Sequence, residues 1–383
     1  MSKTRLVYEL YINETKVNPQ PFDVVIEPGI GKISVVTAKL FFSGPDQIRR
    51  RMEYPKHGTP VRLVWGRRPK IRTWYGYIHH TQPTTGEPQA LYGGLVATYV
   101  MVGTGQGLIM ERTRDWRQIT DSGIAKQIAQ EYGLSFVGHR TRKVHDYLYQ
   151  PGISDFSWLK QRAEKSSRVL HIENGTLYFV DPASLAMATR SNPLTVRMDR
   201  VKEHDDWVLD VRPLHGSLVP ISGKQANRQL TGIDYASNQL LKAKSPASEP
   251  APEWVARNRE IASVTDLYID AEALAIANEQ WLKADVDMIG EPDAIPGNLL
   301  DLQGEAVKPE LTGVWMVTEA RHHLHLKDPS AVGAAATYYA TATVSRNSSD
   351  ALILRDRSLP RVDDACTLMG GRWVAANRRD VLL

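Results

Sequence analysis

The sequence predicts an α+β protein that is mainly β, with strands at both ends and a small helical unit between them. Residues 5 to 110 contain short β-rich runs that are separated at short intervals by Pro, Gly, Asn and Asp. β-rich runs return between residues 190 and 347, and a region of helical periodicity separates these two stretches. Such a series of short strands indicates a β-sandwich or a β-barrel.

The first predicted domain, residues 1–112, is all β. Its strand-like runs are LVYELYI, ISVVTAKLFFSG, TPVRLVWG, TWYGYIHHTQPT and LYGGLVATYVMVG. GTGQG at residues 103–107 follows a strand, as a nucleotide-binding loop would. It lacks the Walker lysine and a surrounding βαβ unit, so a turn is the favoured interpretation.

The second predicted domain, residues 113–189, begins with a helix. Thr120 is a candidate N-cap for the run DSGIAKQIAQEYG, and Gly133 is a stop signal. Ile124, Ile128 and Tyr132 are spaced four apart, which places them on one helical face.

A second helix and a hairpin complete this α/β unit. Ser154 or Asp155 is a natural N-cap, and the helix is expected to end near Ser166. RVLHIE and TLYFVD then alternate as two strands around Asn174-Gly175, a strong signal for a two-residue hairpin turn.

The third predicted domain, residues 190–347, is again β-rich, and we expect it to share the fold of the first despite a dissimilar sequence. Residues 236–256 are rich in Ala, Ser and Pro and are predicted to form an exposed linker or long loop. Strong helix formers predict a helix over about 263–283.

Residues 348–383 are predicted to be a C-terminal tail that becomes ordered only against a partner. The segment is polar and arginine-rich. Its apolar patch consists of Leu368, Met369, Trp373 and Val374. Docking of this patch on an adjacent subunit or a neighbouring protein is the expected role.

Composition excludes several classes of protein. Hydrophobic residues make up 42% of the 383-residue chain, which is enough for a real core. The single cysteine, Cys366, cannot form an internal disulfide. The N-terminus has no apolar signal-peptide core, and no segment approaches the ~20 apolar residues of a membrane span. We therefore expect no stable membrane association.

The net charge of +4 is unevenly distributed. Residues 1–120 carry 17 Lys and Arg against 9 Asp and Glu, a net of +8, so the remainder is −4. The runs 49–51 and 67–72 supply much of the excess. Clustered cations can bind a polyanion such as DNA. A solvated face or a charge-matched protein interface is the favoured alternative, because no nucleic-acid-binding motif accompanies the clusters.

The best candidates for metal ligands are His322, His323 and His325. On a strand, His323 and His325 point to one face and His322 to the other, so a third ligand would have to come from elsewhere. An ordinary half-exposed strand is favoured, and His79-His80 is interpreted in the same way.

No catalytic site is predicted. The adjacent pairs Asp205-Asp206 and Asp363-Asp364 would diverge on an extended chain, and neither a GxSxG elbow nor an HExxH helix occurs. Ser154 and Asp155 are explained as helix caps, residues 160–165 as a solvent-exposed face and His171 as a strand residue. Cys366 lies in the tail. We therefore predict no catalytic, cofactor-binding or metal-binding residue, and no enzyme.

Residues 147 to 182, YLYQPGISDFSWLKQRAEKSSRVLHIENGTLYFVDP, resemble a segment of the late-control and baseplate-hub proteins of tailed phages. That family is related to the N-terminal half of type VI secretion spike proteins. The resemblance lies in a Q-x-G-x-S-D turn, a helix of the form F/W-L-x-x-x-A-E and a hairpin with an aromatic-rich strand. ERTRDWRQITDSGIAKQIAQEYGL and the segments from AEALAIANEQ to YYATATVSR are similar to further parts of the family. Residues 348–383 have no counterpart in it.

The resemblance implies two β-barrel domains of the tail-tube type, joined by the helix–helix–hairpin α/β domain. It further implies a homotrimer whose six barrels mimic a sixfold ring. Such a ring would connect a tail tube or distal tail protein to a threefold spike or fibre, with passing contact to DNA in the lumen. The expected location is the virion, at the tail tip or baseplate, after assembly in the host cytoplasm.

Two other classes of function stay open. The chain could be a cell-wall hydrolase of the tail tip that uses an unrecognised acidic pair. It could also be a binding module that docks a host receptor or DNA through its basic N-terminal third. The structural hub of a phage tail is the favoured interpretation.

Overall fold

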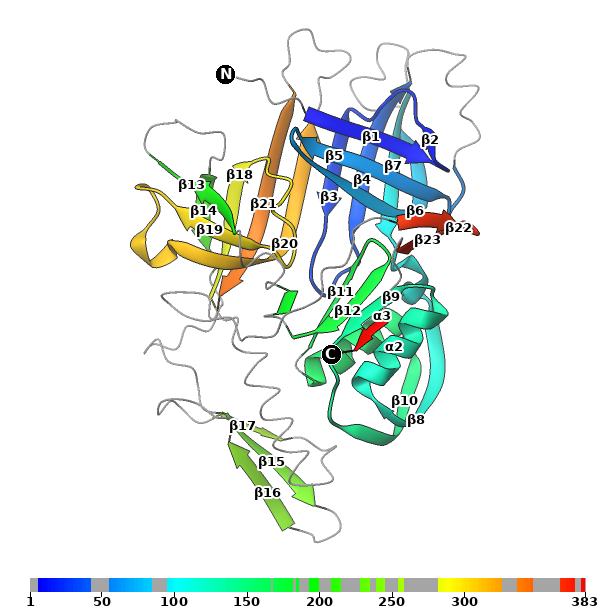
Figure 1. Ribbon diagram of the computed structural model, residues 1–383, viewed down its shortest axis with the longest axis vertical. Helices are drawn as coiled ribbons and strands as arrows, with labels where there is room; N and C mark the ends of the chain where they lie inside the picture. Colours follow the sequence, from blue (N-terminus) through cyan, green and yellow to red (C-terminus); the bar gives the residue numbers. More distant parts are fainter. Residues whose placement is uncertain are drawn as a thin grey trace.

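The computed structural model describes most of the chain, and the statements below concern this part. The described residues are 6–42, 55–84, 95–166, 168–181, 184–185, 193–199, 208–214, 228–234, 239–244, 254–257, 282–325, 336–346, 366–375 and 380–382. The chain is mainly β, as predicted, and its centre is one large curled sheet (Figure 1).

The first half of this sheet comes from the first hundred residues. Its strands are β1 (Leu6–Ile12), β2 (Thr15–Lys16), β3 (Asp23–Glu27), β4 (Val35–Phe42), β5 (Pro60–Arg67), β6 (Lys70–Thr84) and β7 (Leu95–Gly103). Every second residue of β4 is buried, the pattern of a strand with one face against a core. These inward faces form a hydrophobic core that includes Leu40, Leu63 and Tyr99.

The second half comes from late in the chain. Its strands are β13 (Leu194–Arg197), β14 (Val208–Pro213), β18 (Leu282–Ile289), β19 (Leu299–Gln303), β20 (Gly313–His325) and β21 (Thr337–Arg346). The 3-10 turn η3 (Pro309–Leu311) precedes β20. A separate hydrophobic core around Trp315, Val317 and Met288 fills this half.

The two halves repeat one strand order. Neighbouring strands run β1-β5-β6-β7-β4-β3 in the first half and β13-β19-β20-β21-β18-β14 in the second. Counted along the chain within each half, omitting the two-residue β2, both orders are 1-4-5-6-3-2. Corresponding pairs are antiparallel in both halves, except that β13 is parallel to β19 whereas β1 is antiparallel to β5. The predicted similarity of the two β-rich stretches is therefore confirmed.

Local irregularities also correspond. β6 shifts register against β7 between Ile78 and His80, and β20 shifts against β21 between Val317 and Glu319. The Ile78 N–H donates to a carbonyl just before β5, and the Val317 N–H donates to a carbonyl just before β19, both at 2.9 Å. Ile78 and Val317 are therefore equivalent positions of a repeated unit.

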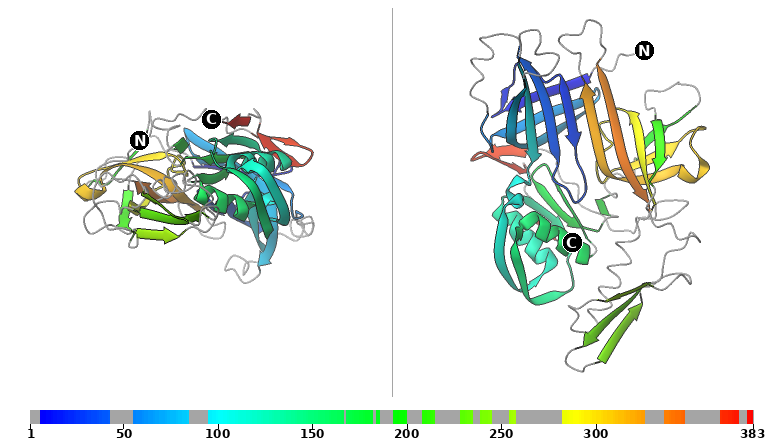
Figure 2. Two further views of the ribbon diagram at one scale, coloured as in Figure 1. Left: turned by 90° about the horizontal axis from the view of Figure 1, so that it is seen from below. Right: turned by 180° about the vertical axis from the view of Figure 1, so that it is seen from behind.

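Strand β20 joins the halves. Its beginning pairs with β19, whereas His322–His325 pair with Asp23–Ile26 of β3 in the first half. Leu324 and Tyr338 accordingly contribute to the first core, although they come from strands of the second half. This β3–β20 ladder, which we call the seam, makes one continuous sheet of the two halves (Figures 1 and 2).

The α/β unit lies against one end of the first half (Figures 1 and 2). Its elements are η2 (Gln106–Ile109), β8 (Glu111–Thr120), α2 (Asp121–Glu131), β9 (Ser135–Gly138), β10 (Val144–Ser154), α3 (Asp155–Lys165), β11 (Val169–Glu173) and β12 (Thr176–Val180). The favoured turn at 103–107 is observed, since β7 ends at Gly103 and η2 follows. Helices α2 and α3 pack on strands β9, β11 and β12 around a core of their own.

The predicted local signals of this unit are confirmed. Thr120 caps α2 by accepting a hydrogen bond from the Gly123 N–H, and Ser154 caps α3 in the same way. The hairpin between β11 and β12 turns at Asn174 and Gly175, which both have positive φ as a two-residue turn of this type requires.

One prediction about the second half needs correction, and another falls almost entirely outside the described residues. Within the predicted loop 236–256, β16 (Gln239–Lys244) and the first residues of β17 (Trp254–Arg257) pair with β15 (Arg228–Asp234) as a small sheet. Backbone pairing therefore overrides the loop-like composition. The predicted helix over 263–283 lies outside the described residues apart from Leu282 and Lys283, which begin strand β18.

The C-terminal tail is also ordered against this chain itself. It contains β22 (Cys366–Met369), β23 (Arg372–Ala375) and β24 (Asp380–Leu382). β22 and β23 form a hairpin beside β6, and β24 is parallel to β9. Among the described residues, no helix is both long and apolar enough to cross a membrane.

Candidate functional site

The residues that open helix α3 are structural. Asp155 is fully buried, and both of its carboxylate oxygens accept hydrogen bonds. Arg114 and the Tyr132 hydroxyl donate to Oδ2, each at 2.8 Å, and Gln150 donates to Oδ1 at 2.9 Å. Burial and the hydrogen bond to this carboxylate raise the pKa of Tyr132 to about 12. These hydrogen bonds tie the start of α3 to strands β8 and β10 and to the end of α2.

A second buried network links helices α2 and α3. Arg162 Nε donates to Asp121 Oδ1 at 2.6 Å, and His145 Nε2 lies 3.2 Å from the same oxygen. Burial alone would raise the pKa of Asp121, but the hydrogen bond from His145 and the charge of Arg162 outweigh it, so the pKa is lowered. The paired charges hold the two helices together.

Part of the basic N-terminal excess is neutralised within the chain. Lys70 Nζ lies 2.8 Å from Glu291 Oε2, and Arg72 Nη2 lies 3.0 Å from Asp293 Oδ1. Burial raises the pKa of Glu291, and Lys70 opposes the rise. These contacts join the first half to the second within the chain. The other basic run, 49–51, lies outside the described residues, as do Asp205-Asp206 and Asp363-Asp364.

The first histidine of the predicted trio is a packing residue. His322 is fully buried, and the centroid of its ring lies 4.6 Å from that of Trp65 on strand β5. Its Nδ1 is 3.0 Å from the Tyr338 hydroxyl. Burial lowers the pKa of His322 to about 3, so the imidazole is neutral at physiological pH.

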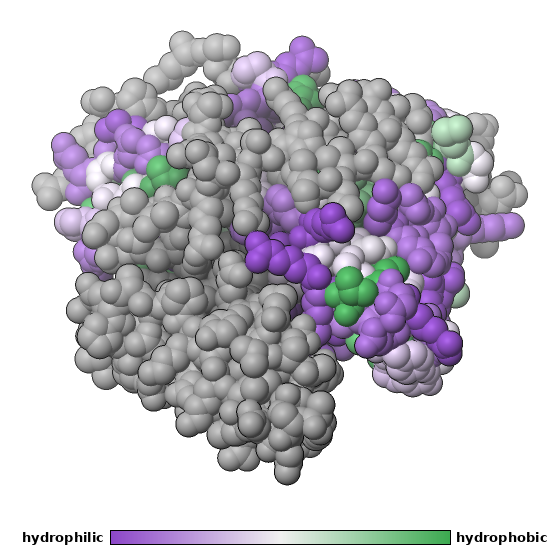
Figure 3. All heavy atoms as spheres, turned by 60° about the horizontal axis from the view of Figure 1, so that its bottom comes forward, coloured by the Kyte–Doolittle hydropathy of each residue, from purple (hydrophilic) through white to green (hydrophobic). Residues whose placement is uncertain are grey.

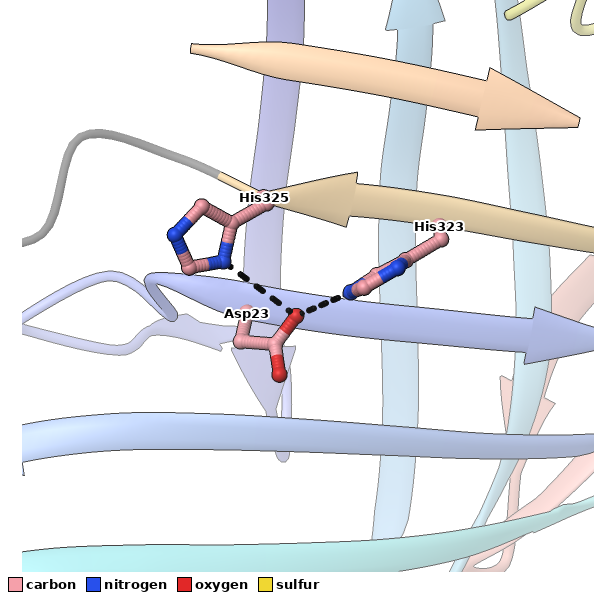
Figure 4. A group of neighbouring side chains, drawn as sticks. All are labelled: Asp23, His323 and His325. Atoms are coloured by element: carbon pink, nitrogen blue, oxygen red, sulfur yellow. Dashed lines mark hydrogen bonds and ion pairs between the residues drawn. The ribbon is translucent and has the colours of Figure 1, made fainter. Parts of the chain in front are cut away.

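The other two histidines meet a carboxylate on the outer face of the seam (Figure 4). His323 Nε2 is 2.6 Å and His325 Nδ1 is 3.7 Å from the same oxygen of Asp23. One ligand-type atom from each of the three side chains lies within 4.8 Å of the others. As predicted, His323 and His325 lie on one face of β20 and His322 lies on the other. The third group, Asp23, could not be predicted from the sequence, because it is distant in the chain and has no local signal.

The tail hairpin docks on strand β6. Trp373 is only 4% exposed, and its ring meets that of Tyr75 with centroids 4.6 Å apart. The indole N–H donates to the Gly76 carbonyl at 2.9 Å, and the Trp373 backbone N–H donates to the Tyr77 hydroxyl at 2.8 Å. The Cys366 thiol donates to the Asn174 carbonyl at 2.8 Å. The expectation that this patch docks on an adjacent subunit or a neighbouring protein is therefore wrong for Trp373, which docks on its own chain. Met369 is 64% exposed.

The face seen in Figure 3 is mostly hydrophilic over the described residues, with hydrophobic side chains in small patches. On strand β10, Val144, Tyr147 and Tyr149 are exposed. The Tyr147 hydroxyl donates to Asp115 at 2.8 Å, and the Arg117 guanidinium lies 5.8 Å from its ring centroid.

No protein-family model and no curated protein matches the sequence. Solved structures do match over nearly the whole chain. A tail protein from Neisseria meningitidis MC58 has a TM-score of 0.62 at 10% identity, covering 89% of this chain and 97% of that chain. The 43 kDa tail protein of prophage MuSo2 from Shewanella oneidensis has a TM-score of 0.62 at 12% identity, covering 90% and 99%.

A third match is the E. coli c3393 protein, a component of the type VI secretion system with structural similarity to the T4 bacteriophage tail proteins gp27 and gp5. Its TM-score is 0.54 at 10% identity, covering 88% of this chain and 76% of that chain. The chain therefore has the fold of phage tail proteins and of a related type VI secretion protein. The family resemblance in the sequence is confirmed at the level of fold.

Proposed function

We propose that this protein is the hub of a phage tail tip or of a phage-derived injection machine, in which three chains form a ring of six barrel-type halves. The observation that carries the proposal is the repeated strand order within one continuous sheet. Since each chain contributes two equivalent halves, a threefold assembly has a nearly sixfold lining. Such a ring would connect a tail tube to a threefold spike or fibre.

The seam suggests how neighbouring chains would join. Within the chain, the end of β20 pairs with β3. The equivalent of β20 in the first half is β6, and the equivalent of β3 in the second half is β14. Among the described strands, the part of β6 after Ile78 pairs only with β7, so its other edge is open. β14 pairs only with β18 among these strands, so it also has an open edge. An unpaired strand edge is a ready site for another chain.

We therefore expect β14 of one chain to lie along the end of β6 in the next. The equivalence of Ile78 and Val317 aligns Thr84 with His323, and the strand registers align Arg212 with Val25. Because Val25 lies opposite His323 at the seam, Arg212 would lie opposite Thr84 between chains. Repetition of this head-to-tail contact closes a ring after three chains.

Engineered disulfides test this arrangement directly. In a Cys366→Ala background, which has no other cysteine, Thr84→Cys and Arg212→Cys should form bonds between chains on oxidation. The product expected in the assembled tail is a covalent trimer. Val25→Cys with His323→Cys is the matched control and should form a bond within one chain. Monomers from the first pair in assembled tails, with the control oxidised, would contradict the proposed contact.

The hub proposal assigns no catalysis to the chain. The acidic and basic groups of the α/β unit described above are paired inside the fold, and the matched solved structures include phage tail proteins. Purified protein should not clear a peptidoglycan suspension. Sustained clearing that is abolished by substitution of a single Asp or Glu would replace the hub by a cell-wall hydrolase.

A further inference from the structure

We propose that Asp23, His323 and His325 form a binding site for a divalent transition metal, with Zn²⁺ as the representative ion, on the outer face of the seam. The backbone places the three side chains together. In the antiparallel β3–β20 ladder, His325 is directly opposite Asp23, and His323 is two residues away on the same strand. All three side chains therefore project from one face of the sheet.

The contacts exceed what an ordinary surface ion pair explains. A hydrogen bond accounts for the 2.6 Å approach of His323 to Asp23. It does not account for His325, whose Nδ1 is 3.7 Å from the same oxygen, beyond hydrogen-bond distance. Both rings nevertheless turn nitrogen atoms toward this carboxylate (Figure 4). Two imidazoles that converge on one oxygen leave a position that a cation can share with all three groups.

The donor set selects the class of metal. Two imidazole nitrogens and one carboxylate oxygen suit Zn²⁺ and neighbouring transition metals, and three protein ligands leave at least one coordination position open. Ca²⁺ and Mg²⁺ bind mainly to oxygen ligands, and Asp23 is the one side chain of this cluster that supplies oxygen. Lys39 of β4 lies opposite Asp23 and adds a positive charge. This charge further disfavours the binding of Ca²⁺ or Mg²⁺, which depends mainly on ionic attraction.

The ligand atoms can adjust to a metal without disturbing the core. The side chains of His323 and His325 are 46% and 42% exposed, so an ion can reach them from solvent. Ligand bonds of about 2.0–2.2 Å require small rotamer changes in these exposed rings. Val24 and Leu324, the buried neighbours of the ligands along the two strands, stay in the first core.

A metal here would tie together two parts of the chain that are 300 residues apart in sequence. Ligands that converge only in the folded seam bind the native state in preference to the unfolded chain, so the ion stabilises the fold. In the first half, the positions that correspond to His323 and His325 are occupied by Thr84 and Gly86, which have no imidazole. The site therefore belongs to the seam within the chain.

Zinc titration of the full-length, tag-free chain, treated first with a chelator, tests the proposal. We expect one Zn²⁺ per chain and a rise in the thermal unfolding midpoint. Co²⁺ in place of Zn²⁺ should give the visible absorption of a nitrogen- and oxygen-ligated ion. Asp23→Asn, His323→Gln and His325→Gln should each weaken binding about tenfold or more, since even outer-shell substitutions cost roughly 10–100-fold.

His80→Gln is the matched control, because His80 is also an exposed strand histidine but lies outside the cluster. It should bind Zn²⁺ as the unmodified chain does. Circular dichroism of each variant verifies that the sheet is intact. Absence of stoichiometric binding, equal affinity in the three cluster variants, or an equal loss in His80→Gln would overturn the proposal.

Discussion

Replacement of Trp373 by alanine should release the tail hairpin from strand β6 while the rest of the chain stays folded. The indole is almost completely buried, meets the ring of Tyr75 and donates a hydrogen bond to the Gly76 carbonyl. The hairpin is near the C-terminus and supplies a single residue, Trp373, to the buried hydrophobic set of the described residues. Its detachment should therefore leave the two sheet cores in place.

The magnitude follows from the buried area. A tryptophan side chain that buries roughly 150–250 Å² contributes roughly 4–6 kcal/mol at ~25 cal/mol per Å². Measured Trp to Ala substitutions in cores cost about 3–5 kcal/mol. Since about 1.4 kcal/mol corresponds to a tenfold change in an equilibrium, the detached population should rise on the order of 10²- to 10³-fold.

Cys366 reports the detachment. Its thiol contacts the Asn174 carbonyl when the hairpin is docked, and it is the only cysteine of the chain. Its labelling rate with a thiol reagent should rise with the detached population in Trp373→Ala. Met369→Ala, on the same hairpin but mostly exposed, should leave the rate nearly unchanged. Equal labelling of the two variants would refute the assignment of the docking energy to the indole.

Two further predictions concern buried ionisable groups. Asp121→Asn leaves Arg162 as an uncompensated buried charge and should cost about 3–5 kcal/mol of unfolding free energy in denaturant titrations, whereas Glu9→Gln, at an exposed pair, should cost less than about 1 kcal/mol. Equal costs would contradict the structural role of the network. Since the pKa of Asp121 is lowered by folding, its contribution is present above its unfolded pKa of about 3.9 and lost as the pH falls through the folded value. For His322 the folded pKa of about 3 is below the unfolded value of about 6.5, so the unfolded state binds the proton first. As the pH falls from about 6.5 to about 3, this group should lower the free energy of unfolding by about 1.4 kcal/mol per pH unit. His322→Gln should reduce the slope of the unfolding free energy against pH in this range. An unchanged slope would show that His322 is not the group responsible.

Features set by neighbouring residues could be predicted from the sequence. Asn174-Gly175 turns a hairpin because both residues tolerate positive φ, and Thr120 and Ser154 cap helices through their own hydroxyls. The alternation of β20 also placed His323 and His325 on one face. Each of these depends on a few adjacent residues.

Features set by distant contacts could not be predicted in this way. Asp23 joins the two histidines only because β3 pairs with β20, and no local pattern specifies that register. The sequence predicted that Trp373 docks on another chain, because its actual partners, Tyr75 to Tyr77, lie on a distant strand of the first half. The composition of residues 236–256 suggested a loop, whereas pairing with β15 makes strands of Gln239–Lys244 and Trp254–Arg257.

The position and copy number of this chain in an intact particle test the central proposal most directly. Cryo-electron microscopy of tails that carry a tagged chain would give both. We expect three copies in a ring at the tail tip, with six barrel-type halves around the lumen and β14 of each chain beside β6 of the next. Absence of the chain from the particle, or a copy number that three does not divide, would contradict the account.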